Sequence, residues 1–268
     1  MKSYKLVNDQ FIELLENNII PWKDHLEIRL PHQNYLTMAV YQGANQLLLN
    51  GISIFKKYKS PYWLTFDQLK LLNGRVRAKE KSSKIIFYEK KVNKKGDKYT
   101  LLRYHSIFNL DQVDGIPKNP KRKRLFDLYK EKNIIDNYIN GPKIIEGDEN
   151  FYCPEDDFIE LEDKTDFLNL SYCMIKSTGH IRRLNRICSN FEDDHPLWTL
   201  EELTCQIGQS LLMSLVGSSP SLKDSVFKNN RKTYIEAWLP ILKDNPSMIL
   251  NASSYARRAI KLILLGEG

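Results

Sequence analysis

The chain has 268 residues, of which 42% are hydrophobic, enough to fill the core of one large domain or of two ordinary ones and too many for a wholly disordered chain. No apolar run approaches the roughly 18–20 residues that a membrane span needs. The first residues also lack the apolar stretch and the small-residue cleavage site of a secretory signal. Four cysteines lie far apart without a C-x-x-C pair, which predicts reduced, mostly buried thiols in a cytoplasmic protein.

The net charge of +7 is unevenly distributed along the chain. Residues 1–124 contain 24 Lys and Arg against 11 Asp and Glu, whereas residues 125–268 contain 16 against 22. A basic first half joined to an acidic second half indicates two units with different roles. The basic half is a candidate for binding a polyanion such as nucleic acid, although a basic surface can also serve solubility alone.

Two helices are predicted near the N-terminus. Apolar residues at helical spacing predict a helix over residues 4–20, which Pro21 ends because the residue before a proline is disfavoured in a helix. The segment ANQLLL after Gly43 predicts a short helix that Asn50-Gly51 closes.

A capped helix and a hairpin follow. Thr65 is typical of a helix N-cap, because its hydroxyl can accept a backbone N–H, and Gln68 completes a capping box. The β-branched and aromatic residues of 82–92 and 99–110 then predict two strands, joined by the charged tip 93–98. Two prolines and five basic residues mark 115–124 as a domain boundary, which contacts a phosphate backbone or is a solvated linker.

Helical patterns dominate the second half. Thr199 and Glu202 have the spacing of a capping box, and Pro240 is expected to kink or interrupt a later helix. The predicted helices cover about 125–139, 167–177, 199–215, 231–246 and 247–266, and a strand-like stretch covers 151–161.

Tyrosines and tryptophans are interleaved with lysines throughout the basic half. Proteins that bind single-stranded nucleic acid use this combination, because cations follow the phosphates and rings stack on unpaired bases. Any one of these aromatic residues has an alternative role in a hydrophobic core, and Trp63 in SPYWLTF is expected to be packed inside.

The motifs PWKDH, YQGANQLLL, SPYWLTFDQLKLLNGRV and FNLDQVDGIP occur in an order and spacing that resembles the N-terminal domain of ArdC-type antirestriction proteins. The later motifs YCPEDDFIEL, TGHIRRLNR, EELTCQIG and YIEAWLPILKDN resemble the zincin-like metallopeptidase domain of the same family. The resemblance implies an α+β fold, in which an α+β nucleic-acid-binding domain precedes a mainly helical zincin-like domain with a small sheet. The expected boundaries are 1–118 for the first domain, 119–145 for a basic linker and connecting helix, and 146–268 for the second domain.

The zinc-peptidase signature H-E-x-x-H of that family is degenerate in this chain. An alignment on Thr178-Gly179-His180 places Tyr172 and Lys176 in the two histidine positions and Cys173 in the glutamate position. Tyrosine is a poor zinc ligand at neutral pH, a lysine ammonium repels a dication, and cysteine cannot replace a carboxylate as general base. A later acidic position of the family pattern is Gln206. We therefore expect no catalytic residues, no bound metal and no cofactor, although zinc is usual in the family.

Other chemistry at this helix has weaker support. Cys173, Lys176 and His180 would share one helical face if the helix extended that far, which would suit a cysteine nucleophile. Gly179 is expected to end the helix first, and a metal site from Cys173, His180, Cys188 and His195 has no recognised spacing. The favoured interpretation is a structural pseudo-zincin in which Lys176 faces solvent or pairs with Glu201 or Glu202.

The resulting functional hypothesis is an antirestriction protein of a mobile element that binds single-stranded DNA non-specifically and has an inactive second domain. The alternative is an anti-defence factor that binds a host defence or restriction protein in the former peptidase groove. Gln42 and the glycine-poor segment VRAKEKSSK depart from the family pattern. The predicted DNA contacts are Trp22, Lys23, Tyr41, Gln42, Asn45, Lys56, Lys57, Lys59, Arg75, Arg77, Lys79 and Lys81.

Overall fold

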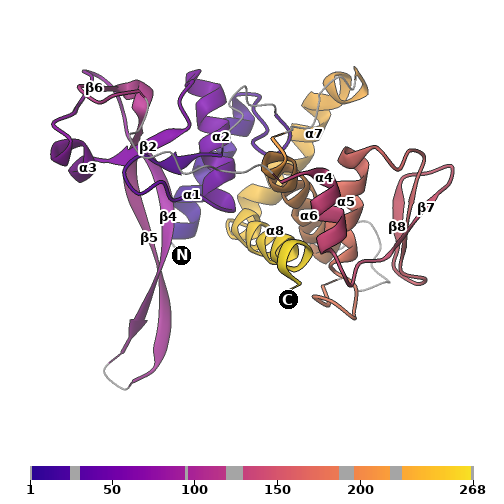
Figure 1. Cartoon of the computed structure of the whole chain (residues 1–268). Coiled ribbons are helices and arrows are strands. Elements are labelled where there is room, and N and C mark those ends of the chain that lie inside the picture. Colours follow the sequence, from indigo (N-terminus) through magenta and orange to yellow (C-terminus); the bar gives the residue numbers. More distant parts are fainter. Residues whose placement is uncertain are drawn as a thin grey trace. The chain divides into compact units, whose positions relative to one another are not determined.

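The computed structural model describes residues 2–24, 31–93, 96–118, 129–186, 196–217 and 225–266 (Figure 1). The chain divides into two compact units, and each unit consists of three segments that are separated in the sequence. Unit 1 contains Met1–Pro21, Leu26–Phe126 and Asn229–Ser247, and unit 2 contains Trp22–His25, Asp127–Lys228 and Met248–Gly268. The α+β fold class is confirmed. The predicted domain boundaries, 1–118, 119–145 and 146–268, stay a prediction.

Unit 1 is built around a four-stranded sheet with the order β1-β2-β5-β4. A short pair of strands, β3 and β6, lies beside it. Its elements are α1 (Lys2–Glu16), β1 (Gln33–Asn34), α2 (Ala44–Lys56), β2 (Tyr62–Thr65), α3 (Phe66–Leu71), β3 (Arg75–Val76), β4 (Ser83–Val92), β5 (Lys98–Asn109), the 3-10 helix η1 (Leu110–Gln112), β6 (Val113–Asp114) and most of α7 (Ser225–Asp244).

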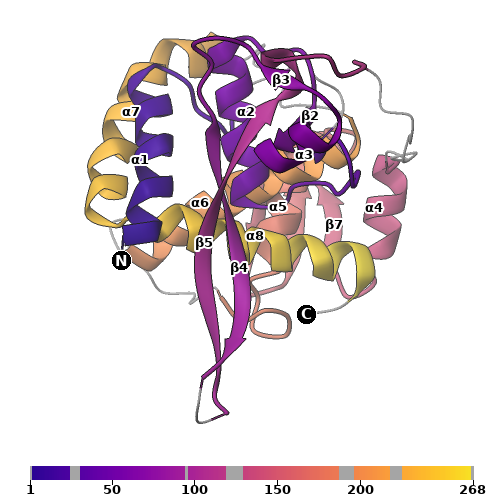
Figure 2. The ribbon, with the colours of Figure 1, turned by 90° about the vertical axis from the view of Figure 1, so that its left-hand side faces the viewer.

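The predicted hairpin is confirmed as β4 and β5, which pair in antiparallel register and extend as a long arm (Figures 1 and 2). Side chains alternate between the two faces of a strand. The register pairs Ile85 with His105 and Phe87 with Arg103, so these four residues share one face of the hairpin. At the root of the arm, Ile85 and Trp63 are fully buried, as expected for Trp63.

Helix α2 of unit 1 differs from the sequence-based prediction, and α7 is not interrupted at Pro240, whereas a kink there stays a prediction. Asn50-Gly51 does not close the short helix, because α2 continues to Lys56. A Cβ at Gly51 would lie 2.6 Å from Leu14 and 2.9 Å from Pro21, so this glycine allows α1 to approach α2 closely. Pro240 is accommodated within α7. This helix lies beside α1 (Figure 2), where the Asn8 amide donates to the Leu242 carbonyl at 2.7 Å.

Unit 2 is mainly helical with a small sheet of order β7-β9-β8. The predicted stretch 151–161 forms two antiparallel strands rather than one, and the predicted helix over 125–139 is described only as α4. The elements are α4 (Glu131–Asn137), β7 (Lys143–Glu146), β8 (Phe151–Cys153), β9 (Phe158–Leu161), α5 (Phe167–Ser177), α6 (Pro196–Leu215) and α8 (Met248–Leu265).

Helix α6 begins at Pro196, so Thr199 lies inside the helix and the predicted capping box is wrong. Proline is favourable at a first helical position because its missing N–H would have no partner there. A Cβ at Gly208 would lie 2.7 Å from Ile175, so α5 and α6 are in close contact. Among the described residues, no helix is both long and apolar enough to cross a bilayer.

Candidate functional site

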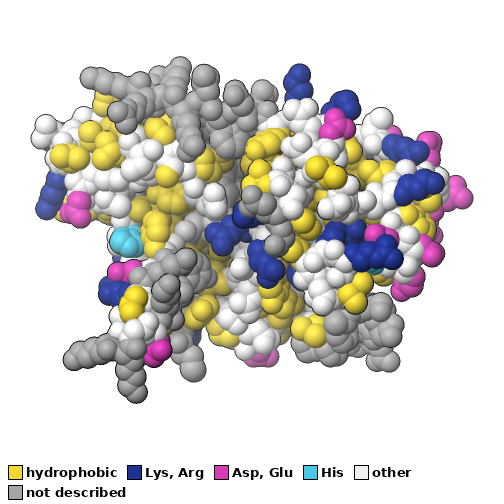
Figure 3. All heavy atoms as spheres, turned by 60° about the horizontal axis from the view of Figure 1, so that its bottom comes forward, with side chains coloured by type: hydrophobic (Ala, Val, Ile, Leu, Met, Phe, Trp, Pro, Cys, Tyr) yellow, Lys and Arg dark blue, Asp and Glu magenta, His cyan; other side chains and the backbone are white. Residues whose placement is uncertain are grey.

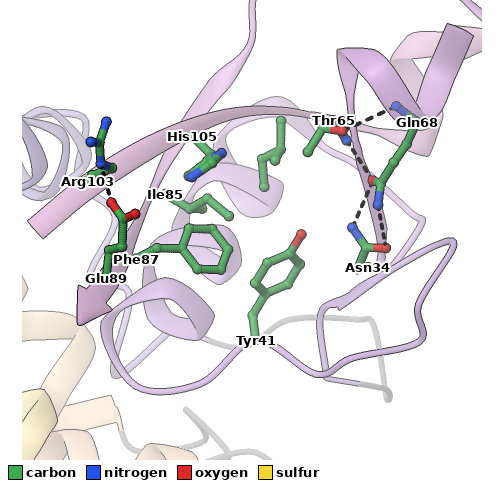
Figure 4. Close-up of a pocket in the computed structure, with 10 residues that line it drawn as sticks. Asn34, Tyr41, Thr65, Gln68, Ile85, Phe87, Glu89, Arg103 and His105 are labelled. Atoms are coloured by element: carbon green, nitrogen blue, oxygen red, sulfur yellow. Dashed lines mark hydrogen bonds and ion pairs between the residues drawn. The ribbon is translucent and has the colours of Figure 1, made fainter. Parts of the chain in front are cut away.

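A pocket of about 620 Å³ opens on the sheet of unit 1 (Figure 4). Ile85 and Ile107 are fully buried and form its floor. Phe87, His105 and Tyr41 point into the same space, the first two from the hairpin and Tyr41 from the loop before α2. Phe87 is 45% exposed and packs edge-to-face on His105, with ring centroids 4.8 Å apart. The pocket therefore presents aromatic surface to solvent.

Polar side chains form the opposite wall of this pocket. The amides of Asn34 and Gln68 bond reciprocally, at 2.9 and 3.2 Å. Gln68 also closes the predicted capping box with Thr65, which the structure confirms. Burial raises the pKa of the Tyr41 hydroxyl, which has a hydrogen bond with Asn34 that acts in the opposite direction. The polar atoms of this wall therefore have hydrogen-bond partners within the wall itself.

Charged residues continue the same hairpin face outward from the pocket. Arg103 donates from Nε to Glu89, which also lies 3.5 Å from the Lys91 ammonium. Because β4 pairs Lys91 with Tyr99, this face also contains an exposed tyrosine. The space-filling view shows a hollow of unit 1 with hydrophobic side chains inside it and a histidine at its rim (Figure 3). This face thus contains two pairs of an aromatic and a cationic residue, Phe87 with Arg103 and Tyr99 with Lys91, with Glu89 between them.

Phe87, Arg103 and His105 were not among the site residues predicted from the sequence. Both strands were predicted, whereas the register that brings these three side chains together was not. The signal available in the sequence was the alternation along the strand, which places Ile85, Phe87 and Glu89 on one face.

The predicted DNA contacts are only partly brought together. Tyr41 lines the pocket. Arg77 donates to the Asp111 carbonyl and lies 3.6 Å from Glu80. Lys79 and Lys81 lie in the loop that leads into β4. The exposed members of the predicted set are Gln42, Lys56, Lys57, Lys59, Arg75, Arg77, Lys79 and Lys81.

Two of the predicted contacts, Trp22 and Asn45, have structural roles instead. Trp22 is only 1% exposed and donates from Nε1 to Gln206 at 3.2 Å, so its ring is not available for stacking. Trp22 and Lys23 both belong to unit 2. Asn45 uses its amide to hold β4, accepting from the Ile86 N–H and donating to the Ile86 carbonyl. We therefore remove Trp22 and Asn45 from the candidate surface, and the contact predicted for Lys23 stays a prediction.

In unit 2, two arginines hold the C-terminal end of α5. Arg186 donates to the Ile175 carbonyl and to Thr178 Oγ1, and forms a two-pronged ion pair with Glu201 at 2.8 and 3.0 Å. Arg183 donates to the Ser177 carbonyl at 2.7 Å and pairs with Asp157. The last carbonyls of a helix have no partners within it and carry partial negative charge, so guanidinium groups stabilise this end.

Tyr172, in the first histidine position of the signature, and Gln206, in the later acidic position, belong to one hydrogen-bonded chain of side chains. The Tyr172 hydroxyl donates to one oxygen of Glu202, and the Gln206 amide donates to the other. Trp22 donates in turn to the Gln206 oxygen. Burial raises the pKa of Tyr172 well above its ordinary value, as do Cys205 and Glu202 nearby. Tyr172 is therefore a neutral phenol that donates a hydrogen bond.

Sequence and structure comparisons address both units. Residues 1–128 match the family model of the N-terminal domain of anti-restriction factor ArdC, and residues 139–255 match that of a zincin-like metallopeptidase. The crystal structures of the antirestriction ArdC protein from the R388 plasmid are similar to this chain. The metal-free form has a TM-score of 0.75 at 25% identity, and the Mn(II)-bound form has 0.76 at 26%. Each comparison covers 97% of this chain and 96% of the ArdC chain.

The chain belongs to the ArdC-type antirestriction proteins. It is also 23% identical, over 98% of its length, to two DNA primase TraC proteins of Escherichia coli. The chain spans only 27% and 20% of those relatives. It is 22% identical to the uncharacterized protein y4eC of Sinorhizobium fredii, with 95% of this chain and 89% of that protein covered.

The metal implied by this ArdC-type fold does not fit the residues of unit 2. A divalent cation needs groups that donate electron pairs, whereas Tyr172 and Gln206 both direct hydrogen-bond donors at Glu202. Burial raises the pKa of the Cys173 thiol to about 11, with Lys176 acting in the opposite direction, and the positive charge of Lys176 would repel a dication. Across the described residues, no group of three or more His, Cys, Asp or Glu side chains is placed to hold a metal ion.

The alternative of a cysteine nucleophile also lacks support in this ArdC-type chain. Helix α5 ends at Ser177, and His180 is buried with its Nδ1 accepting from the Arg182 N–H. The same high pKa disfavours the nucleophilic form of Cys173. Cys188 and His195, of the other cluster considered, lie outside the described residues.

Proposed function

We propose that this protein binds single-stranded DNA through unit 1 without sequence preference, and that it protects a mobile element from host restriction. We further propose that unit 2 is a zincin-like domain without peptidase activity. The observation that carries the first part is the hairpin face of unit 1, on which the exposed rings of Phe87 and Tyr99 lie across from Arg103 and Lys91 beside an open pocket. Single strands are bound by this combination, whereas duplexes hide the faces of their bases.

The charge of the chain and the relatives support the same proposal. The first half of the sequence has a net charge of +13, from 24 basic and 11 acidic residues. The matching family model is that of the N-terminal domain of an anti-restriction factor. A salt titration of the full chain against single- and double-stranded oligonucleotides of one sequence tests the proposal. We expect tighter binding to the single strand and a steep loss of affinity with salt, because bound phosphates release counterions. Equal affinity for both, or no salt dependence, would contradict it.

The loop before β4 is expected to supply part of the salt dependence. Lys79 has a left-handed backbone conformation, with φ at 68°, so asparagine is the neutral replacement that fits it best. We expect the pair Lys79→Asn/Lys81→Gln to reduce the slope of log affinity against log salt by about 1.4, at roughly 0.7 for each phosphate that the variant no longer neutralises. The control Lys132→Gln/Lys164→Gln removes two exposed charges from unit 2. An identical slope for the two double variants would exclude this loop from the interface.

Unit 2 is expected to be insensitive to metal. Protein purified without chelators should contain far less than one equivalent of zinc or manganese, and EDTA should leave its unfolding temperature unchanged. The reason is that a ligand stabilises a folded protein only when it binds the folded state. Elemental analysis and a thermal scan measure this directly, and an unfolded peptide substrate tests for cleavage. A near-stoichiometric metal content or metal-dependent cleavage would overturn the proposed inactivity.

A further inference from the structure

The pocket of unit 1 has the size and lining of a specific ligand site. Its volume of about 620 Å³ lies within the range of roughly 300–1,000 Å³ that is common for small-molecule sites. All residues that line the pocket belong to unit 1, including the two buried isoleucines, Phe87 and the two amide side chains. The pocket is therefore complete within that unit. Phe87 is a large apolar ring that stays 45% exposed, and a ligand that covers it removes apolar surface from water, which favours binding.

The geometry points to one unstacked nucleobase of a single strand as the occupant of this pocket. This inference rests on the proposed single-strand binding and names the place where a base is held. Phe87 and Tyr41 flank the same open space. The Phe87 ring makes an edge-to-face contact with His105, which restricts its orientation. A planar, aromatic ligand suits two ring faces, because offset-stacked arrangements are favourable between π-systems.

The charges around the pocket fit a base that remains attached to its phosphates. Arg103 and Lys91 contribute two positive charges to the same face, and Glu89 contributes one negative charge between them. A guanidinium has five N–H donors, of which Glu89 accepts one, and the Arg103 side chain is 52% exposed. Arg103 is therefore positioned to contact a phosphate at the mouth of the pocket while the base lies inside.

The polar wall indicates tolerance among the four bases. The Asn34 oxygen accepts from the Leu36 and Thr37 N–H groups as well as from Gln68. The Gln68 oxygen accepts from the Thr65 N–H and from Asn34. Since both amide oxygens are already used, few groups remain to read the hydrogen-bonding edge of a base, and stacking should dominate. Stacking has little sequence preference because every base has a π-face.

The experiment compares two strands of equal charge, a dT 12-mer and a 12-mer of abasic deoxyribose phosphates, bound to the full chain. We expect the dT strand to bind about 5- to 150-fold more tightly, the range expected for stacking of one base on aromatic side chains. Phe87→Ala should remove most of this ratio, and Phe87→Trp should retain it. Tyr104→Ala is the matched control, because Tyr104 is 50% exposed and lies on the opposite face of the hairpin. It should leave the ratio unchanged.

The outcomes separate this inference from the function on which it rests. Salt-dependent binding of both strands with the same affinity, or a ratio that survives Phe87→Ala, would overturn the base pocket and leave single-strand binding intact. Failure to bind either strand would overturn both. A third arm measures binding of dTMP alone. If dTMP matches the dT strand in affinity and Phe87→Ala abolishes its binding, the pocket holds a free nucleotide, and the assignment to a strand is wrong.

Discussion

Replacement of Glu201 by alanine is expected to lower the free energy of unfolding of unit 2 by about 3–5 kcal/mol, because the variant leaves the guanidinium of Arg186 buried without its counterion. The side chains of Arg186 and Glu201 are only 7% and 15% exposed. Hydrogen exchange of the amides in α5 and α6, measured on the full chain across a urea series, reports the loss in this unit.

An exposed ion pair of the same length provides the control. Lys132 and Asp136 are also 2.8 Å apart, but their side chains are 81% and 56% exposed. Solvent screens such a pair, so Asp136→Ala should cost at most about 1 kcal/mol. Replacement of both buried partners, as in Arg186→Met/Glu201→Leu, should cost much less than Glu201→Ala, since no charge is then left unpaired. Equal losses for Glu201→Ala and Asp136→Ala would show that the buried pair does not stabilise α5.

These contacts support the proposal that unit 2 keeps its fold without a metal. Arg183 and Arg186 fix the end of α5 through carbonyls, Thr178 and acidic partners, none of which involves a metal ligand. The chain from Tyr172 through Glu202 to Gln206 satisfies polar groups that would otherwise be left without partners in the interior. The motif TGHIRRLNR is thus explained by structural roles within unit 2.

The sequence was sufficient to predict the elements whose signals are local. The hairpin strands, helix α5 and the capping box of Thr65 and Gln68 were predicted from β-branched runs, helical spacing and cap chemistry. The degenerate metal positions were also visible, because the resemblance supplied the alignment. The local pattern gave a wrong prediction where a residue is needed for a tertiary contact. Gly51 was predicted to end a helix, but its small size instead allows α1 to approach α2.

The features that the sequence did not predict depend on contacts between distant segments. The Trp22 ring lies against Gln206, 184 positions away, and the Asn8 amide reaches the carbonyl of Leu242 in α7. No periodicity in one segment predicts such pairs. The pocket was missed for a related reason, since it needs the register of β4 against β5 together with the loop that carries Tyr41. The alternative of a host-protein partner in the former peptidase groove stays a prediction.

A buried histidine gives unit 1 a specific sensitivity to acid. His32 is fully buried, and its Nδ1 accepts a hydrogen bond from Trp63 Nε1 at 3.0 Å, which requires the neutral ring. Its backbone N–H donates to the Gln46 side chain at 3.1 Å. Burial lowers the pKa of His32 from 6.5 to about 3, with a backbone hydrogen bond at Pro61 acting in the opposite direction. Between these two pH values, the unfolded chain binds a proton at this residue that the folded chain does not.

The free energy of unfolding of unit 1 should therefore fall as the pH is lowered below 6.5, by about 1.4 kcal/mol per pH unit from this residue, until the pH approaches 3. His32→Asn preserves a hydrogen-bond acceptor but cannot titrate in this range. From pH 7.5 to pH 5, the unmodified chain should lose about 2 kcal/mol more than His32→Asn, measured by urea unfolding with hydrogen exchange in β2 and β5. The carboxylates titrate in both proteins, so the difference isolates His32. Parallel losses in the two proteins would mean that His32 becomes protonated in the folded state without disturbing Trp63.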